Sequence, residues 1–174
     1  EMNMKLLIVN DMEGATGVVD WNQVMEGNTE YARFCDLLTN DVNAAINGAF
    51  RGGADEVFIT DGHNYARNLI IEKLDPRAML NYGSPSRLSM VQGVDQGMDA
   101  IIFVAYHARA GSLNAILCHS WSLNTTNIWI NGKVTGEFGL NGAVAGAFDV
   151  SPIMITGDDA VCMEAKEWVP EIET

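Results

Sequence analysis

Apolar residues occur along the chain in two patterns: short continuous runs, and longer stripes with helical spacing. Four continuous runs are bounded by polar residues or glycine, which predicts buried strands. They cover residues 4–10, 56–60, 100–105 and 152–156. Two weaker runs at 115–118 and 127–130 predict two further short strands, and Asn131-Gly132 predicts a tight turn after the second.

The clearest helical stripe lies between Glu30 and Arg51, where apolar residues recur at steps of three and four. Thr29 is the predicted N-cap of this helix, because a hydroxyl can accept a hydrogen bond from the first free N–H groups. Gly52-Gly53 is predicted to end it, since glycine adopts the left-handed conformation of a C-cap without strain.

Two shorter helices are predicted at 137–148 and 158–168, the second capped by Asp158 or Asp159, and the stretch 62–89 is rich in loops. A strand, a long helix and a second strand in this order imply a right-handed crossover and a parallel pair. The predicted fold is therefore α/β, with a largely parallel sheet and flanking helices in three layers. Residues 1–174 are expected to form a single domain.

Composition and charge narrow the function. The chain has 174 residues, of which 48% are hydrophobic and 19% charged, and this excludes collagen-like, coiled-coil and disordered classes. Ten basic and 23 acidic residues give a net charge of −13, which repels nucleic acids and anionic membranes, so neither is an expected partner. Three widely spaced cysteines without a CxxC motif and the absence of a signal-like apolar run favour a cytoplasmic protein.

Residues capable of chemistry follow the predicted strands. In open α/β sheets, ligands bind at the carboxyl ends of the strands, so side chains that come directly after a strand are candidates for the site. All three histidines of the chain occupy such positions, two carboxylates follow the first strand, and another carboxylate begins a helix between two glycines. These candidates are Asp11, Glu13, His63, His107, His119 and Glu137.

Carboxylates and imidazoles gathered at one edge of a sheet are typical of a site for zinc or a similar divalent ion. In an extended segment, the side chains of Asp11 and Glu13 would point to the same face. Five ligands exceed what one open zinc site needs, and they suit two ions roughly 3.5–4 Å apart. Such a pair would activate water and polarise a carbonyl, so the residues predict hydrolysis, most simply of an amide.

Each candidate also has an ordinary structural explanation. Asp11 could begin a turn, His63 could be a surface residue after the turn dipeptide Asp61-Gly62, and His107 could be a hydrogen-bonded core residue. Cys118 and His119 could suggest a nucleophilic pair, but neighbouring residues of a strand point to opposite faces, which predicts a core position for the cysteine. The coincidence of the candidates at one edge favours the metal site.

Five short motifs occur in order and at appropriate intervals. They are Asp-Met-Glu-Gly at 11–14, Asp-Gly-His at 61–63, Tyr-His-Ala-Arg-Ala at 106–110, His-Ser at 119–120 and Gly-Glu-Phe-Gly-Leu-Asn at 136–141. Together they resemble the D-aminopeptidase family of metallopeptidases, whose members are often labelled dipeptide-transport proteins. The resemblance extends from about Lys5 to the region of Gly157.

The resemblance implies a site with two zinc ions per subunit. It gives Asp11 as the bridging carboxylate, Glu13 and His107 as ligands of one ion, and His63 and Glu137 as ligands of the other. It implies that His119 is a catalytic side chain that does not bind a metal, and our reading of the residues favours proton transfer or stabilisation of an oxyanion for it.

The resemblance also implies the substrate and the assembly. Family members remove N-terminal D-amino acids from short peptides and form homo-oligomers, described as pentamers stacked into decamers. The family continues with a C-terminal region after the last motif, so residues 1–174 are expected to be a fragment of a longer two-domain chain. The alternatives left open are a non-catalytic peptide-binding or transport-associated module and a metal-dependent hydrolase of other amides or esters.

Overall fold

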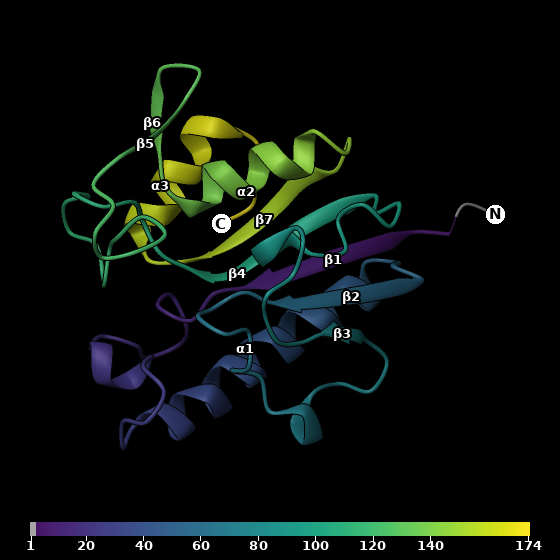
Figure 1. The fold of residues 1–174 in the computed structure, drawn as a ribbon. Coiled ribbons are helices and arrows are strands. Elements are labelled where there is room, and N and C mark those ends of the chain that lie inside the picture. The colour runs from purple at the N-terminus through teal and green to yellow at the C-terminus, as the bar shows by residue number, and fades with distance from the viewer. Residues whose placement is uncertain (1–2) are drawn as a thin grey trace.

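The structure is a computed structural model and describes residues 3–174. Its centre is a parallel sheet of five strands in the order β3-β2-β1-β4-β7 (Figure 1). The strands are β1 (Lys5–Asn10), β2 (Glu56–Asp61), β3 (Met79–Asn81), β4 (Ala100–Tyr106) and β7 (Ser151–Gly157). The predicted α/β class with a parallel sheet is confirmed.

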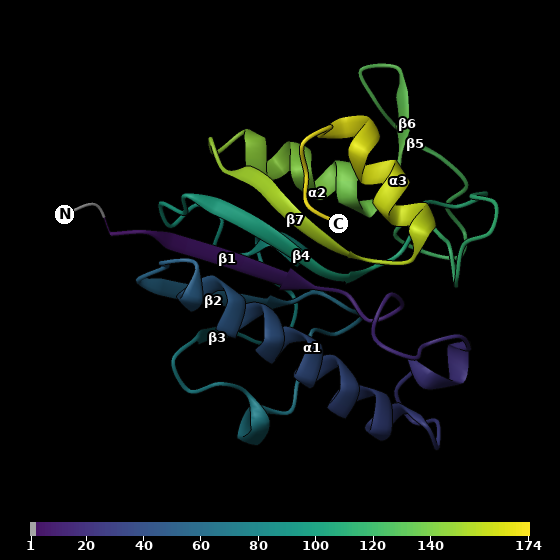
Figure 2. The ribbon, with the colours of Figure 1, turned by 180° about the vertical axis from the view of Figure 1, so that it is seen from behind.

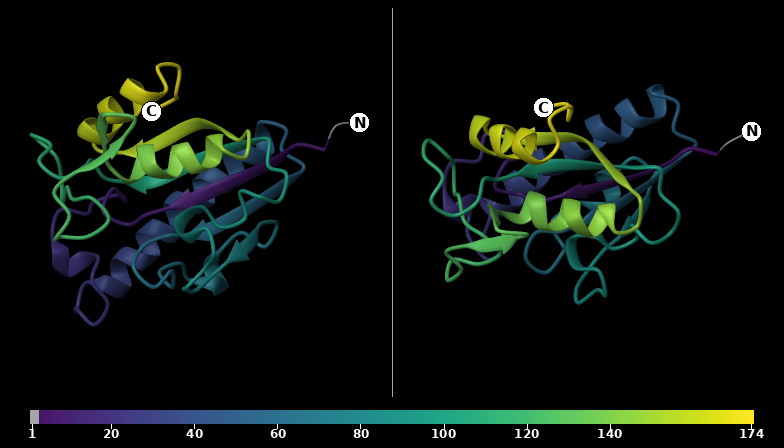
Figure 3. Two further views of the ribbon diagram at one scale, coloured as in Figure 1. Left: turned by 45° about the horizontal axis from the view of Figure 1, so that its top comes forward. Right: turned by 90° about the horizontal axis from the view of Figure 1, so that it is seen from above.

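Helices lie on both sides of the sheet. The helix α1 (Tyr31–Arg51) covers one face and α2 (Glu137–Gly146) the other, while α3 (Asp159–Trp168) packs beside the edge strand β7 (Figures 2 and 3). The short strands β5 (Ile128–Ile130) and β6 (Lys133–Thr135) form a separate antiparallel hairpin. Single turns of 3₁₀ helix occur at Trp21–Gln23, Ile71–Lys73 and Ser89–Val91.

The continuous apolar run of β1 is explained by its central position. Leu6 and Ile8 point into the core cluster under α1, whereas Leu7 and Val9 point into the cluster under α2 and α3. Because successive side chains of a strand alternate between the faces, a strand covered on both faces must be apolar at every position. Burying each of these side chains contributes about 1.5–3 kcal/mol, so β1 anchors both cores.

The prediction of a strand at 115–118 is wrong. This segment is a loop, and its apolar side chains lie at the margins of the two cores: Leu117 packs on one cluster, and Ala115 and Cys118 pack on the other. Within residues 3–174, this segment pairs with no strand of either sheet. The run at 127–130 does form a strand, β5, and the turn at Asn131-Gly132 has positive φ at both residues, as a tight hairpin turn requires.

The helix boundaries bring one further correction. Glu30, not Thr29, is the N-cap of α1, and its side chain makes no capping hydrogen bond. Gly53 ends this helix with φ +104°, as predicted, and Asp158 caps α3 by accepting a hydrogen bond from the N–H of Val161. Sequence analysis missed β3, which is a half-exposed edge strand of three residues in the loop-rich stretch.

The topology leaves a crevice at one end of the sheet. The chain passes from β1 to β2 on one side, and it later returns to form β4 on the other side of β1. The carboxyl ends of β1 and β4 therefore flank the point where the strand order changes direction, which is the usual binding position in this architecture. Loops gather there, at the left of Figure 1. In residues 3–174, no helix is long and apolar enough to cross a membrane.

Candidate metal centre

The loop after β1 carries the two carboxylates that head the site. The N–H of Asp11 donates to Val104 O and that of Gly14 donates to Ala105 O, both at 2.9 Å, so the loop lies flat against the end of β4. A Cβ at Gly14 would be 2.0 Å from Tyr106 O, which excludes any side chain there. Residues 12–14 form a turn rather than an extended segment, yet both carboxylates reach the same imidazole, that of His63.

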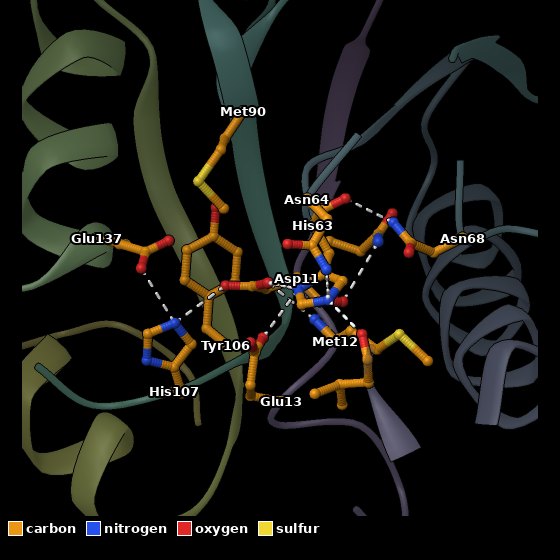
Figure 4. Close-up of polar contacts among 12 residues, drawn as sticks. Asp11, Met12, Glu13, His63, Asn64, Asn68, Met90, Tyr106, His107 and Glu137 are labelled. Atoms are coloured by element: carbon orange, nitrogen blue, oxygen red, sulfur yellow. Dashed lines mark hydrogen bonds and ion pairs between the residues drawn. The ribbon is translucent and has the colours of Figure 1, made fainter. Parts of the chain in front are cut away.

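One set of possible ligands surrounds His63. Its Nδ1 lies 3.1 Å from Asp11 Oδ1 and 3.1 Å from Glu13 Oε2, and all three side chains are buried (Figure 4). The ligand atoms of Asp11, Glu13 and His63 lie within 4.8 Å of one another, which is compatible with a single ion. We call these three residues the His63 group.

A second set surrounds His107. Its Nε2 lies 3.3 Å from Asp11 Oδ2 and 3.1 Å from Glu137 Oε1, and these side chains are buried as well (Figure 4). Their ligand atoms also lie within 4.8 Å of one another. We call Asp11, His107 and Glu137 the His107 group; Asp11 belongs to both groups and offers a different oxygen to each histidine.

This grouping differs from the pairing that the resemblance implied. The shortest contacts place Glu13 beside His63, and Glu137 beside His107. Glu13 is also within 4.8 Å of His107 and His119 in a third possible set, so it lies between the two groups. The structure thus brings together all six residues that sequence analysis selected.

His119 lies at the mouth of the site. Its ring stacks on His107, with centroids 3.9 Å apart, and it packs against Trp21 in an edge-to-face arrangement, with centroids 5.4 Å apart. Its Nε2 is 3.6 Å from Glu137 Oε1 and 3.9 Å from Glu13 Oε1. It belongs to a loop and does not follow a strand. The N–H of His119 donates to Ala108 O at 3.3 Å, which holds this loop beside the segment of His107.

Hydrogen bonds outside the cluster orient the three imidazoles. His63 directs Nε2 at Val24 O (2.8 Å), His107 directs Nδ1 at Ala108 O (3.0 Å), and His119 directs Nδ1 at Leu117 O (2.9 Å). Since a carbonyl oxygen only accepts, Nδ1 of His107 and Nδ1 of His119 carry the proton in neutral rings. The other nitrogen of these two rings then presents its lone pair to the carboxylates, which is the arrangement that metal-binding histidines use. His63 Nε2 also lies 2.7 Å from the amide nitrogen of Asn64, and its Nδ1 faces Asp11 and Glu13.

Unpartnered polar atoms provide a test of whether metal ions fit. Asp11 Oδ2, Glu13 Oε2 and His107 Nε2 are fully buried and have no hydrogen-bond partner among the described residues. Buried polar groups are normally satisfied, because an unpaired one costs about 1–3 kcal/mol. In residues 3–174, the ion pairs of Asp11, Glu13 and Glu137 are all with histidines. Three carboxylates and imidazole lone pairs directed at one space fit divalent cations.

The pKa values of the clustered residues also favour the binding of cations. Burial disfavours charge on both imidazoles, but the neighbouring carboxylates outweigh it and hold the pKa values of His63 and His107 well above their usual range. Burial also opposes ionisation of Asp11, yet hydrogen bonds with His107 and His63 hold its pKa well below the ordinary value. Burial, together with the charge of Asp11, raises the pKa of Glu13. The pocket therefore attracts positive charge strongly.

The site opens into a cleft of about 660 Å³ that Met25, Tyr65 and Trp121 help to line. A larger hollow of about 1100 Å³ lies between α1 and strands β4 and β7, but it contains no histidine or cysteine among its lining residues. The smaller cleft is therefore the candidate site. Sequence analysis did not select Trp121, whose N–H donates to Glu137 Oε1 at 2.8 Å.

Two buried carboxylates outside the cluster support the loops that carry the ligands. Asp61 ends β2 and accepts hydrogen bonds within the loop after His63, and Glu164 of α3 accepts hydrogen bonds from Arg109 and Gly136. Burial raises the pKa of Glu164, and the two backbone donors partly oppose this rise. Sequence analysis did not select Glu164, because its position in an apolar helix stripe carries no motif.

Comparisons with known proteins agree with this geometry. The D-aminopeptidase family model matches residues 4–174. A D-aminopeptidase of Bacillus subtilis (strain 168) is 39% identical over 171 residues, which cover 98% of this chain and 62% of the relative. A solved structure described as the Zn-dependent D-aminopeptidase DppA from Bacillus subtilis, a self-compartmentalizing protease, superposes with a TM-score of 0.94 at 38% identity.

The superposition covers 97% of this chain and 61% of the DppA chain, so the sequence spans about three fifths of the length of these relatives. The matched part contains all five motifs, the whole sheet and both ligand groups. The family that the motifs indicated is confirmed: this chain belongs to the D-aminopeptidase family.

Proposed function

We propose that this chain contains the metal centre of a dizinc aminopeptidase that releases N-terminal D-amino acids from short peptides. The observation that carries the proposal is the convergence of Asp11, Glu13, His63, His107 and Glu137 on one buried space. Three atoms of this set, Asp11 Oδ2, Glu13 Oε2 and His107 Nε2, have no hydrogen-bond partner among the described residues. The preference for zinc and for D-amino acids is supported by the descriptions of the Bacillus subtilis relatives.

Different residues of the chain would have different roles in hydrolysis. Zinc ions bound by the two groups would act as Lewis acids and make water acidic enough to attack at neutral pH. Asp11 would hold the two ions at a fixed separation, since each of its oxygens faces a different histidine. The buried floor of the cleft would limit the water around a bound peptide and so strengthen electrostatic interactions there.

His119 is the proposed proton-transfer group. Its Nδ1 is occupied by Leu117 O, so a neutral ring directs the basic Nε2 towards Glu13 and Glu137 at the mouth of the cluster. From that position it would take a proton from the attacking water or give one to the leaving amine. Leu117 has φ +49°, a conformation that costs a residue with a side chain some strain, and its carbonyl orients the ring.

A homo-oligomer and a cytoplasmic location belong to the same proposal. Four large apolar side chains, Leu113, Trp121, Leu123 and Trp129, are between 49% and 84% exposed in the region from the loop after β4 to the hairpin. Such exposure favours contact with a second copy, and the solution mass of the assembly would measure it. The three cysteines are free thiols, which supports a reducing compartment.

The test of the proposed function is metal analysis followed by peptide hydrolysis. Protein purified without chelator is expected to contain two zinc ions per chain and to release D-alanine from a D-alanyl dipeptide faster than L-alanine from the L-form. Chelation should abolish this release, and added zinc should restore it. Intact peptide after prolonged incubation of the zinc-loaded protein would contradict the peptidase and favour a peptide-binding module.

A further inference from the structure

We propose that Glu164 is a positioning residue that holds the His107 group in a geometry able to bind its metal ion. This inference rests on the proposed dizinc function, and it concerns a side chain of α3 that none of the five motifs contains. Glu164 does not contact the cluster; it acts through the backbone segments that carry two of the ligands.

The position of Glu164 needs an explanation in its own right. The buried face of α3 consists of Ala160, Val161, Glu164 and Ala165, and Glu164 is only 6% exposed. A stripe with this spacing packs on the sheet and normally contains apolar residues. A carboxylate in such a place is costly unless hydrogen-bond donors compensate it. Packing alone would therefore favour an alanine or leucine here.

The donors are two backbone N–H groups from distant parts of the chain. Arg109 N–H donates to Glu164 Oε2 and Gly136 N–H donates to Oε1, both at 2.8 Å. Each oxygen therefore serves one segment, and the carboxylate fastens the loop after β4 to the residue that begins α2. Hydrogen bonds to a charged acceptor are about twice as strong as those between neutral groups.

These two segments carry the ligands of one group. Arg109 follows His107 by two residues, and Gly136 immediately precedes Glu137. The distance of 3.1 Å between His107 Nε2 and Glu137 Oε1 depends on how closely the two backbones approach. Fixing Arg109 and Gly136 to the two oxygens of one carboxylate sets this approach.

Gly136 shows how close the approach is. A Cβ on this residue would lie 2.9 Å from Arg109 Cβ and 2.9 Å from Glu164 Oε1, distances that real side chains do not adopt. The absence of a side chain lets the two backbones and the carboxylate meet. Glu164 Oε1 is therefore part of this close contact, and a side chain on residue 136 would displace it.

The experiment is a zinc titration of metal-free protein carrying Glu164→Gln. A glutamine has one acceptor oxygen, so its amide group would face one of the two N–H donors and separate the segments. Removing a residue that orients ligands typically weakens metal affinity about 10–100-fold. We expect that loss for one of the two zinc ions and wild-type affinity for the other. The matched control is Glu167→Gln, the same change at an exposed position of α3, which should bind both ions normally.

Two single-site backgrounds identify the affected ion. With His63→Ala, the remaining ion is held by the His107 group, and Glu164→Gln should weaken it; with His107→Ala, Glu164→Gln should leave the remaining ion unchanged. Equal loss at both ions, or no loss at either, would overturn the proposal. A wild-type chain that binds no zinc would instead contradict the metal centre itself, so the two failures are distinguishable.

Amide hydrogen exchange in the metal-free protein provides a readout independent of zinc. The N–H groups of Arg109 and Gly136 should exchange faster in Glu164→Gln, while amides in the centre of β1 keep their protection. Unchanged exchange at both positions would show that the carboxylate does not fasten the segments, and would overturn the proposal.

Discussion

The His63 group and the His107 group share Asp11 and lie at the same edge of the sheet, but the chain supports them differently. The carboxylate that supports the loop of His63 is close to it in the sequence, whereas His107 and Glu137 come from segments that a carboxylate of a third element joins. The contrast concerns the residues behind the ligands, since the ligand types and distances in the two groups are similar.

Asp61 organises the loop of His63 over a short stretch of sequence. It is 1% exposed and accepts hydrogen bonds from the N–H groups of Asn68 (2.5 Å) and Leu69 (2.9 Å) and from the side chain of Asn68 (2.7 Å). The same Asn68 amide donates to the carbonyl of His63 at 2.7 Å (Figure 4). These three donor groups lie within eight residues of the carboxylate, and a longer bond of 3.3 Å comes from the side chain of Asn10 on the neighbouring strand β1.

Support for the His107 group crosses much larger sequence distances. Glu164 lies 55 residues from Arg109 and 28 from Gly136, so its two bonds form only when α3 has docked beside β7. The ring of His63 also bonds to Val24 O, but the carboxylate behind it is bound mainly by its own loop, whereas the carboxylate behind the His107 group depends entirely on tertiary packing. Variants that affect one group and spare the other test this difference.

The largest expected effect comes from the residue that the groups share. Asp11→Ala removes the two oxygens that face His63 and His107 and should empty both sites, because each histidine loses its common carboxylate partner. We expect zinc content near zero and a loss of hydrolysis well beyond the 10–100-fold typical of residues that only orient ligands. Elemental analysis of the purified variant measures the metal directly. Retention of two ions would show that Asp11 does not bridge, and the two groups would then be independent sites.

The second largest effect should be a loss of turnover in His119→Ala, with metal binding by both groups intact. His119→Ala removes the ring that stacks on His107, but His119 lies beyond the shortest ligand contacts. Loss of a proton-transfer group typically costs about 10²–10⁴-fold in rate. We expect two zinc ions per chain with kcat reduced by that factor and KM little changed. Loss of one ion together with the activity would instead assign His119 to the metal ligands.

The sequence allowed prediction of the parts that depend on local pattern. The continuous runs of β1 and β4 predicted buried parallel strands, and the placement of His63 and His107 after strands predicted their meeting, because parallel strands end at one edge. His119 was assigned to the end of a strand that does not exist. Its position depends on the loop from 107 to 120 folding back on itself, and hydrophobic periodicity does not encode that path.

The two supporting carboxylates, Asp61 and Glu164, also differ in how far the sequence pattern predicts them. Asp61 precedes its histidine by two residues in the sequence, so the motif Asp-Gly-His already contained it. Glu164 has no such neighbour, and its role depends on which backbone groups α3 meets after docking. Pattern analysis of one sequence therefore recovers locally supported ligands together with their support, and for the others it recovers the ligands alone.

The smallest of the three effects should come from Asp61→Asn, the counterpart of the change at Glu164. An asparagine keeps the shape of the side chain but replaces one acceptor oxygen with a donor, which would face the N–H groups of Asn68 and Leu69. The loop should loosen, and zinc affinity should fall about 10–100-fold at the His63 group alone. Titration in a His107→Ala background, where only the His63 group remains, measures this loss. Titration in a His63→Ala background should show none.

A control variant and one contrary result of Asp61→Asn show whether the two groups are supported separately or together. Asp36→Asn removes an exposed ion pair with Lys73 on the surface of α1 and should leave both affinities unchanged, because such pairs contribute little. If Asp61→Asn weakened the two groups equally, the loop of His63 would be coupled to the rest of the site through the shared Asp11. The two groups would then behave as a single unit, and the difference in how the chain supports them would have no consequence for metal binding.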